Sequence, residues 1–438
     1  MKYYSTNGKA PMADLQKAVV KGLAEDRGLY MPERINKMPK EFFDHIQEMS
    51  FRDIAYNVAS AFFGEDVDLD ALKELVFDTL PFECPVVKIK ENIYTLELFH
   101  GPTLAFKDVG ARFMARLLRY FTSGTDTNKT GKSNINVLVA TSGDTGSAVA
   151  NGFLGVEGIH VYVLYPKGKV SPIQECQFTT LGKNITAIEV DGVFDDCQAL
   201  VKNAFMDAEL NAHMKLTSAN SINVARFLPQ AFYYFNAYAQ MKKLGLADNL
   251  VMCVPSGNFG NICAALFGHE MGLPIKRFIA ANNANDIFYQ YLQTGKYEPK
   301  PSKQTLANAM DVGDPSNFAR IYDLYGKSHE RITSVISGAT YSDDQIRETL
   351  KQCYDETGYI LDPHGTCGYR ALQEGLKPGE IGVFCETAHP AKFKDTVEAI
   401  IHTEVPIPDR LAAFMKGEKK SVPMTKDFAD FKTYLLQQ

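Results

Sequence analysis

The sequence lacks the features of membrane, secreted and metal-binding proteins. It contains no run of about 18 consecutive apolar residues that could span a bilayer, and its first residues, MKYYSTNGKAP, include no apolar signal core. Its eight cysteines form no C-x-x-C pair, and its histidines form no cluster with metal-ligand spacing. We therefore expect a reduced, cytoplasmic protein with no metal site and no membrane segment.

An excess of positive charge is also absent. The formal net charge is −6, with 46 Lys and Arg against 52 Asp and Glu, so no global attraction to nucleic acid or anionic membranes is expected. Any phosphate site must therefore be local. Gly131 to Ser133 resemble the end of a P-loop, but Asp126 stands where that motif requires a glycine, so we predict an ordinary loop there.

The chain does contain α/β periodicity over a length that predicts two domains. It has 438 residues, of which 45% are hydrophobic and 22% charged. From residue 134 onward, short β-rich runs alternate with helical patterns, and the apolar runs VLVA and VMCV are typical of parallel strands covered on both faces. The predicted strands are Asn136 to Ala140, His160 to Tyr165, Thr186 to Val190, Leu250 to Val254, Arg277 to Ala281 and Gly382 to Cys385.

The first 80 residues have a different pattern. The segments ADLQKAVVKGLAEDRG and EDVDLDALKELVFDTL have helical periodicity and acidic surfaces, which predicts a mainly helical N-terminal cap. The two prolines of PFECP, Pro81 and Pro85, indicate a boundary after this cap.

Two segments contain candidate reactive side chains, and the second of them opens a helical pattern. In HGPTLAFKDVGARF, Lys107 has apolar and small neighbours, and desolvation there would lower its pKa and favour the neutral amine that forms Schiff bases; most lysines, however, simply lie on the surface. In ATSGDTGSAVANGF, unpaired backbone N–H groups and the hydroxyls of Ser142, Thr145 and Ser147 suit an anion. The alternative is an ordinary helix cap formed by Asp144 or Thr145.

Two further segments follow predicted strands directly. In PSGNFGN, Gly257 and Gly260 would let the backbone approach a phosphate closely, although a structural turn explains the glycines equally well. In ETAHPAKF, Thr387 stands at the carboxyl end of its strand, where ligands of open α/β sheets gather. A capping role is the alternative for this threonine.

Together, and in this order, these segments resemble the threonine synthase family of fold-type II pyridoxal-phosphate enzymes. The resemblance extends over nearly the whole chain, and its motifs are GLAEDRGLYMPE, LFHGPTLAFKD, ATSGDTGSA, TSANSINVARFLPQ, PSGNFGN and TAHPAKF. It implies two parallel or mixed sheets wrapped by helices, beneath the helical cap. The implied domains are the cap (1–80), a large cofactor-binding domain (81–111 and 221–438) and a small mobile domain (112–220).

The resemblance also implies how pyridoxal 5′-phosphate is bound. Lys107 would hold it as a Schiff base and move protons during the reaction. Thr387 would face the pyridine nitrogen, and Asp144 would lie near the cofactor's 3-hydroxyl, where it competes with the phenolate for negative charge unless it is protonated or turned away. The cofactor phosphate would be bound by the backbone of Gly257, Asn258, Phe259, Gly260 and Asn261.

The implied substrate is O-phospho-L-homoserine, which water converts to L-threonine and phosphate in the last step of threonine biosynthesis. Arg226 offers a bidentate fork to the substrate phosphate, although a structural ion pair would also explain a buried arginine. The other candidate substrate-binding residues are Thr141, Ser142, Ser147 and Asn220. A monomer or homodimer is expected.

Two rival functions stay open at this point. One is a phospholyase on the same fold, which would release 2-oxobutyrate without adding water. The other is a noncatalytic metabolite-binding or interaction protein.

Overall fold

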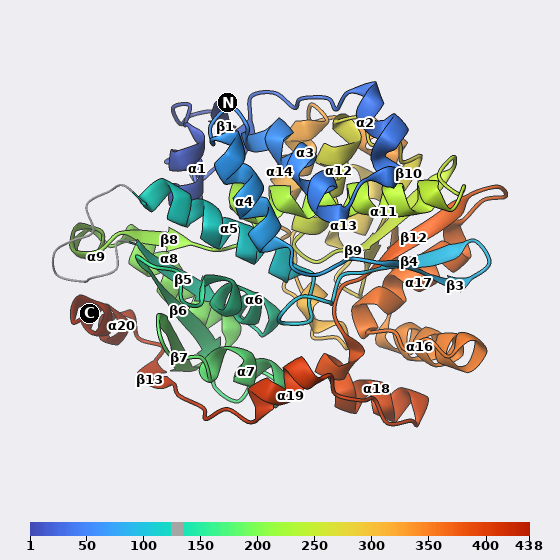
Figure 1. The fold of residues 1–438 in the computed structure, drawn as a ribbon. Helices are drawn as coiled ribbons and strands as arrows, with labels where there is room; N and C mark the ends of the chain where they lie inside the picture. Colours follow the sequence, from blue (N-terminus) through green and yellow to red (C-terminus); the bar gives the residue numbers. More distant parts are fainter. Residues whose placement is uncertain (124–134) are drawn as a thin grey trace.

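The computed structural model describes residues 1–123 and 135–438, and the loop predicted at Gly131 to Ser133 lies outside these ranges. The described chain forms two large sheets surrounded by helices, with the N-terminal helices on one side of the larger sheet (Figure 1). The fold is α/β, and the predicted pair of parallel or mixed sheets is confirmed.

The described strands are β1 (Tyr3–Ser5), β2 (Tyr30–Pro32), β3 (Val86–Lys90), β4 (Ile93–Glu97), β5 (Ile135–Ala140), β6 (Ile159–Pro166), β7 (Ile185–Asp191), β8 (Leu216–Ser218), β9 (Leu250–Pro255), β10 (Arg277–Asn282), β11 (Ile336–Thr340), β12 (Ile381–Glu386) and β13 (Val422–Thr425). All six predicted strands are present, each within a residue or two of its predicted bounds.

The described α-helices are α1 (Leu15–Lys21), α2 (Lys40–His45), α3 (Phe51–Phe63), α4 (Leu69–Thr79), α5 (Lys107–Thr122), α6 (Asp144–Phe153), α7 (Pro172–Thr179), α8 (Phe194–Met206), α9 (Ala208–His213), α10 (Val224–Phe227), α11 (Ala231–Lys243), α12 (Gly260–Glu270), α13 (Ile287–Thr294), α14 (Phe318–Leu324), α15 (His329–Val335), α16 (Asp343–Thr357), α17 (Pro363–Gly375), α18 (Lys394–Ile401), α19 (Asp409–Met415) and α20 (Phe428–Leu436). The 3₁₀ turns are η1 (Ile46–Glu48), η2 (Leu228–Gln230), η3 (Asn308–Met310) and η4 (Pro390–Phe393).

The larger sheet has six strands in the order β11-β10-β9-β12-β4-β3, all parallel except for the antiparallel pair β3 and β4. Both of its faces are buried. Along β9, Met252 and Val254 pack into one apolar cluster, whereas Val251 and Cys253 pack into another on the opposite face. This double burial explains why β9 is apolar throughout, as the sequence predicted.

The smaller sheet has five parallel strands in the order β13-β7-β6-β5-β8. Its edge strand β13 comes from the C-terminal part of the chain, and α20 lies beside this sheet in the lower left of Figure 1. The predicted small domain (112–220) did not include β13 and α20, which the prediction assigned to the large domain (81–111 and 221–438). The domain division itself stays a proposal.

The N-terminal region contains α1 to α4 and the short antiparallel pair β1 and β2. Its helices are mostly held by apolar packing: α3 buries Ile54, Val58 and Phe62, and Ser50 caps its first turn through the backbone N–H of Asp53. Their buried side chains belong to the same cluster as one face of the larger sheet, so this region is packed onto the sheet as a cap.

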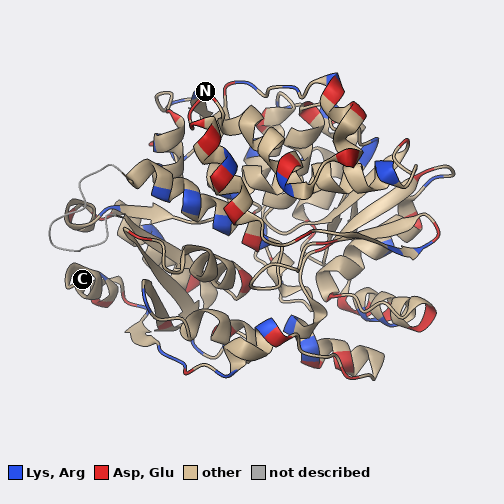
Figure 2. Ribbon diagram, in the orientation of Figure 1, with Lys and Arg blue, Asp and Glu red and all other residues tan. Residues whose placement is uncertain are grey.

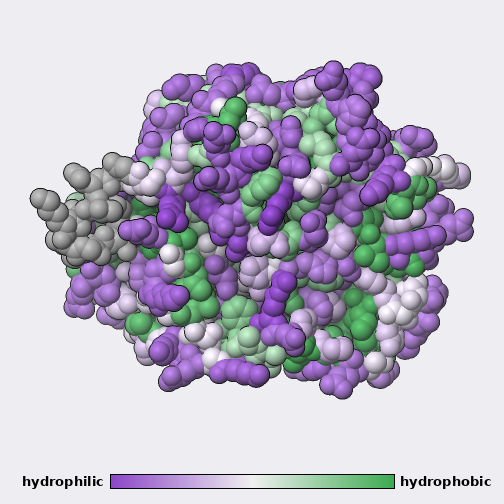
Figure 3. Space-filling view, viewed as in Figure 1, coloured by the Kyte–Doolittle hydropathy of each residue, from purple (hydrophilic) through white to green (hydrophobic). Residues whose placement is uncertain are grey.

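The face of the molecule drawn in Figures 2 and 3 is mixed in character. Lys and Arg are interspersed with Asp and Glu along the ribbon (Figure 2), and the face in Figure 3 is largely hydrophilic with scattered hydrophobic patches. No helix in the described ranges has both the length and the apolar character needed to cross a bilayer. All eight cysteines are free thiols, and seven of them are buried.

Candidate active site

The carboxyl ends of three neighbouring parallel strands define the site. In the larger sheet β12 lies between β9 and β4, so the segments that follow these strands meet at one edge. They are the loop after Pro255, the loop containing Thr387, and the segment that leads to Lys107. The last two are in direct contact, because the Phe106 backbone N–H donates to the Thr387 carbonyl oxygen over 2.8 Å.

Lys107 is the first residue of α5 and is half-buried. Its Nζ donates to Thr145 Oγ1 over 2.9 Å. Burial lowers the pKa of Lys107 to about 8; the carboxylate of Asp144 opposes this change, and the positive charges of Arg226 and Lys392 add to it. A substantial fraction of the amine is therefore neutral near physiological pH, as Schiff-base chemistry requires.

Asp144 begins α6 and is buried with a cationic partner. Its Oδ1 pairs with Lys392 Nζ at 2.5 Å and accepts a hydrogen bond from Gln174 Nε2 over 3.0 Å. Burial alone would raise the pKa of Asp144, but the ammonium groups of Lys392 and Lys107 outweigh it and bring the pKa down to about 2. The ion pair with Lys392 therefore favours the ionised form of Asp144 over the protonated form that the sequence left open.

The loop from Gly257 to Asn261 presents free backbone donors. Within the described part of the chain, the N–H groups of these five residues donate to no protein acceptor. Phe259, the residue before α12, has φ of 67°, and no side chain caps this helix. At Gly257 an added Cβ would lie 2.8 Å from both Ala309 O and Met310 Cα, so only glycine fits. Such a loop at a helix N-terminus is suited to a phosphate.

The backbone of α10 places a buried cation near Lys107. Arg226 is 1% exposed, its Nη1 donates to the Ala219 carbonyl oxygen, and its Nε has no partner among the described residues. No carboxylate of the described chain lies within ion-pair distance of Arg226, although the negative charge of Asp108 acts on it, which argues against the structural ion pair considered from the sequence. Burial lowers the pKa of Arg226 to about 10, so the side chain stays cationic at neutral pH.

The remaining predicted residues differ in whether their side chains are free to bind a ligand. The Thr141 hydroxyl accepts hydrogen bonds from the N–H groups of Gly143 and Gly146, and the Ser147 hydroxyl donates to the Gly143 and Gln174 carbonyl oxygens. Both hydroxyls are thus used to shape the turn before α6.

The side chains of Ser142 and Asn220 are accessible, and they form no hydrogen bond within the described residues. Thr387 is 6% exposed, and its hydroxyl also has no protein partner in the described ranges. These three side chains are therefore available to a ligand.

Comparisons with known proteins identify the family. Residues 80–385 match the family described as pyridoxal-phosphate dependent enzyme, residues 2–80 match the threonine synthase N terminus, and residues 365–435 match the threonine synthase C-terminal family. The chain is 43% identical to threonine synthase of Haemophilus influenzae over 437 residues, which cover 100% of each chain. The chain belongs to the threonine synthase family.

Solved structures agree with this assignment. Threonine synthase from Escherichia coli superimposes with a TM-score of 0.91 at 40% identity over 100% of both chains. A pyridoxal-phosphate-bound threonine synthase from Brucella melitensis also gives 0.91, at 34% identity, covering 100% of this chain and 99% of that one. The chain is therefore a pyridoxal-phosphate-dependent enzyme of threonine biosynthesis, and the predicted fold type II is confirmed.

The residues of this threonine synthase family member fit the cofactor. An amine with a lowered pKa, a loop with free N–H groups at a helix N-terminus, and an unpartnered hydroxyl at a strand end provide groups for its aldehyde, its phosphate and its ring nitrogen. The unpartnered Nε of Arg226 is a further donor that a second anion would satisfy.

Three residues around the site were not predicted from the sequence. Lys392 lies in the TAHPAKF motif between apolar neighbours, the same signal that drew attention to Lys107. Gln174 donates to Asp144 from α7, and no motif indicated it. Ser221 accepts a hydrogen bond from Asn258 Nδ2 over 2.7 Å, linking the loop before α10 to the phosphate loop. Ser221 stands within TSANSINVARFLPQ, so its neighbourhood was indicated although its role was not.

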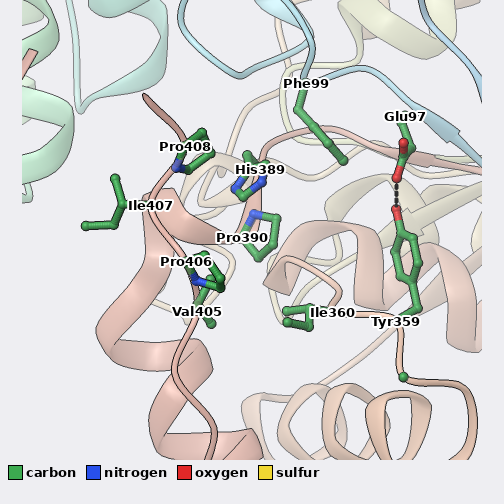
Figure 4. A pocket seen from close by; sticks show the side chains of 11 residues that line it. Glu97, Phe99, Tyr359, Ile360, His389, Pro390, Val405, Pro406, Ile407 and Pro408 are labelled. Atoms are coloured by element: carbon green, nitrogen blue, oxygen red, sulfur yellow. Dashed lines mark hydrogen bonds between the residues drawn. The ribbon is translucent and has the colours of Figure 1, made fainter. Parts of the chain in front are cut away.

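A separate hollow of about 390 Å³ lies beside the loop that follows Thr387 (Figure 4). There the Tyr359 hydroxyl donates to Glu97 Oε2 over 2.5 Å, and burial lowers the pKa of His389 to about 4, so that this ring is neutral. The hollow is lined by Glu97, Phe99, Gly358, Tyr359, Ile360, His389, Pro390, Val405, Pro406, Ile407 and Pro408. No predicted site residue is among them.

Proposed function

We propose that this enzyme converts O-phospho-L-homoserine and water to L-threonine and phosphate, the last step of threonine biosynthesis. The observation that carries the choice of a phosphorylated substrate is Arg226, a buried guanidinium beside Lys107 with an unpartnered Nε and no carboxylate pair among the described residues. The carboxylate of Asp108 acts on this cation but does not pair with it, so the free Nε remains a donor that a phosphate would satisfy.

We assign the cofactor-holding roles to the predicted residues. Lys107 binds the aldehyde, the backbone from Gly257 to Asn261 binds the phosphate, and Thr387 contacts the pyridine nitrogen. When bound, the cofactor supplies an electron-withdrawing ring that stabilises the negative charge left when a proton is removed from the substrate. Because the Thr387 hydroxyl is uncharged, it does not force the pyridine nitrogen to be protonated.

The substrate side of the site is formed by other elements. Arg226 and Asn220 hold the substrate phosphate, with Ser142 as an accessible further donor and with Thr141 and Ser147 acting through the turn that they shape. Lys107, released from the cofactor, moves protons at the substrate α- and β-carbons. Its lowered pKa suits this role, because the amine both accepts and releases protons near neutral pH.

The proposal extends to the setting of the enzyme. We place it in the cytoplasm, as a monomer or homodimer without nucleic-acid or membrane partners. We further propose that the smaller domain (112–220) moves relative to the larger one (81–111 and 221–438) and excludes water until the step that needs it.

The decisive experiment is incubation of the purified holoenzyme with O-phospho-L-homoserine, followed by separate assays for phosphate, threonine and 2-oxobutyrate. Equal amounts of phosphate and threonine are expected. Phosphate with 2-oxobutyrate would instead identify a phospholyase, and no turnover by a protein that binds the cofactor would favour a noncatalytic role. Borohydride reduction followed by peptide mapping should locate the cofactor on Lys107, and labelling of another lysine would contradict that assignment.

A further inference from the structure

Lys392 is a fully buried ammonium group at the junction of three segments. Its side chain is 0% exposed, and its Nζ pairs with Asp144 Oδ1 at 2.5 Å and donates to the Thr103 carbonyl oxygen over 2.9 Å. Lys392 belongs to η4, which follows Thr387, whereas Asp144 begins α6 beside the smaller sheet. A buried charge of this kind is costly unless a partner compensates it, so the two residues must be considered as one unit.

The two oxygens of the Asp144 carboxylate differ in their partners. Its Oδ1 is occupied by Lys392 and Gln174, whereas its Oδ2 accepts no hydrogen bond from any described residue. The next residue, Thr145, contacts the Lys107 amine directly. One oxygen of a buried, ionised group is thus held by protein partners, whereas the other has none among the described residues, and the charge of the group acts on the Lys107 amine.

The chemistry of the cofactor determines what can lie there. Its phenolic oxygen is on the ring carbon adjacent to the one that bears the aldehyde, so groups around Lys107 Nζ are close to that oxygen. A lone carboxylate would repel a phenolate, and a lone ammonium would stabilise it. A carboxylate paired with an ammonium is neutral overall, so the pair neither repels nor stabilises the phenolate strongly.

We propose that Asp144 and Lys392 act as a single neutral pair toward the phenolic edge of the cofactor, with Lys392 as the positioning residue that cancels the charge of Asp144 and fixes its free oxygen. This inference rests on the proposed placement of the cofactor at Lys107. It assigns a role to Lys392 that does not require contact with the substrate.

A double-mutant cycle on the holoenzyme tests this pairing. The variants are Asp144→Asn, Lys392→Met and the double variant, and the measurements are the dissociation constant for pyridoxal phosphate and the pH midpoint of the cofactor's visible absorption. Each single change should weaken cofactor binding by about tenfold, whereas the double variant should stay within about threefold of wild type because no isolated charge remains.

The absorption midpoint gives the sign of each charge. Lys392→Met leaves a negative charge beside the cofactor, which favours its protonated form and should move the midpoint to higher pH. Asp144→Asn leaves a positive charge and should move it to lower pH. Lys394→Met is the matched control, since it removes an ammonium two residues away that pairs with Glu398, and neither measurement should change.

Three results would overturn the pairing: losses that simply add in the double variant, midpoints that do not move in opposite directions, or a Lys394→Met effect as large as that of Lys392→Met. If Lys392→Met fails to fold, Asp144→Asn alone still decides, because an unchanged midpoint in that variant contradicts the proposal. A wild-type protein that binds no cofactor at Lys107 would instead contradict the proposed function.

Discussion

Lys107 and Thr145 are joined by a hydrogen bond of 2.9 Å, although 38 positions separate them in the chain. The first residue of α5 and the first turn of α6 are thereby placed together, one helix following the larger sheet and the other following β5 of the smaller sheet. The amine thus lies where the segments of both sheets meet. Its reactivity depends on groups contributed by each of them, namely Asp144, Arg226 and Lys392.

The lowered pKa of Lys107 predicts how cofactor-free protein takes up pyridoxal phosphate. Only the neutral amine attacks an aldehyde, so the rate should rise by roughly tenfold per pH unit below the pKa and level off above it. With a pKa of about 8, the plateau should begin near that pH. Stopped-flow absorbance measures the rate. Nα-acetyl-lysine is the control, and a protein rate that keeps rising as far as that of this free amine would contradict the burial argument.

Replacement of Arg226 should impair the use of substrate far more than the binding of cofactor. In Arg226→Ala, kcat/KM for O-phospho-L-homoserine should fall by about 100-fold, as expected for the loss of charged hydrogen bonds to phosphate, while the cofactor dissociation constant should change by less than about threefold. Steady-state kinetics and cofactor titration give the two values. Wild-type turnover in this variant would remove Arg226 from the substrate site.

Arg320 provides a matched control for that experiment. It is also fully buried, but its guanidinium donates to the Tyr30 carbonyl oxygen and to Asn317 Oδ1. Arg320→Ala should therefore lower the thermal midpoint, because it leaves buried acceptors without donors, and should not selectively raise KM for the phosphorylated substrate.

Gly257→Ala should weaken cofactor binding by about tenfold or more. The added Cβ would lie 2.8 Å from backbone atoms of Ala309 and Met310, which cannot rotate away, so the phosphate loop must move. Gly375→Ala at the end of α17 is the control, since its Cβ would meet only Ile279 Cδ1 at 3.3 Å. Fluorescence titration with pyridoxal phosphate measures both, and equal affinities would show that the loop does not hold the phosphate.

Glu386 should make the stability of the protein depend on pH. Burial, followed by the negative charge of Asp362, raises its pKa well above the ordinary value of 4.5, and its Oε1 has no partner among the described residues. The folded protein therefore holds this proton to a higher pH than the unfolded chain does. The stability contributed by the group is therefore complete below the ordinary pKa and is lost as pH rises toward the folded pKa.

Glu386→Gln removes this dependence, because an amide does not titrate. Its thermal midpoint relative to wild type should be higher at pH 8 than at pH 5 by about 2 °C or more, measured by differential scanning calorimetry on cofactor-free protein. The exposed Glu418→Gln should show no such difference. A Glu386→Gln midpoint that follows wild type at both values would mean that the carboxyl is ionised in the folded protein.

The fold was predictable where local pattern and burial agree. Strands such as β9 are apolar on both faces because both faces are covered, so the sequence alone shows them. The strands β1, β2, β8 and β13 were not predicted, because three or four residues are too few to establish a period of two. The five-residue strands β3, β4 and β11 were also not predicted. For β13 the stabilising partner is β7, which is more than 200 residues away in the chain, so no local signal could reveal it.

The site divides in the same way. The sequence by itself determined the local chemistry: glycines where a phosphate loop must approach closely, a lysine among apolar neighbours, and a threonine after a strand. Only the tertiary structure decided the charges, because ionisation depends on neighbours brought from elsewhere in the chain. Lys392 keeps Asp144 ionised although 248 positions separate them in the chain, and burial beside Arg226 and Lys392 lowers the pKa of Lys107.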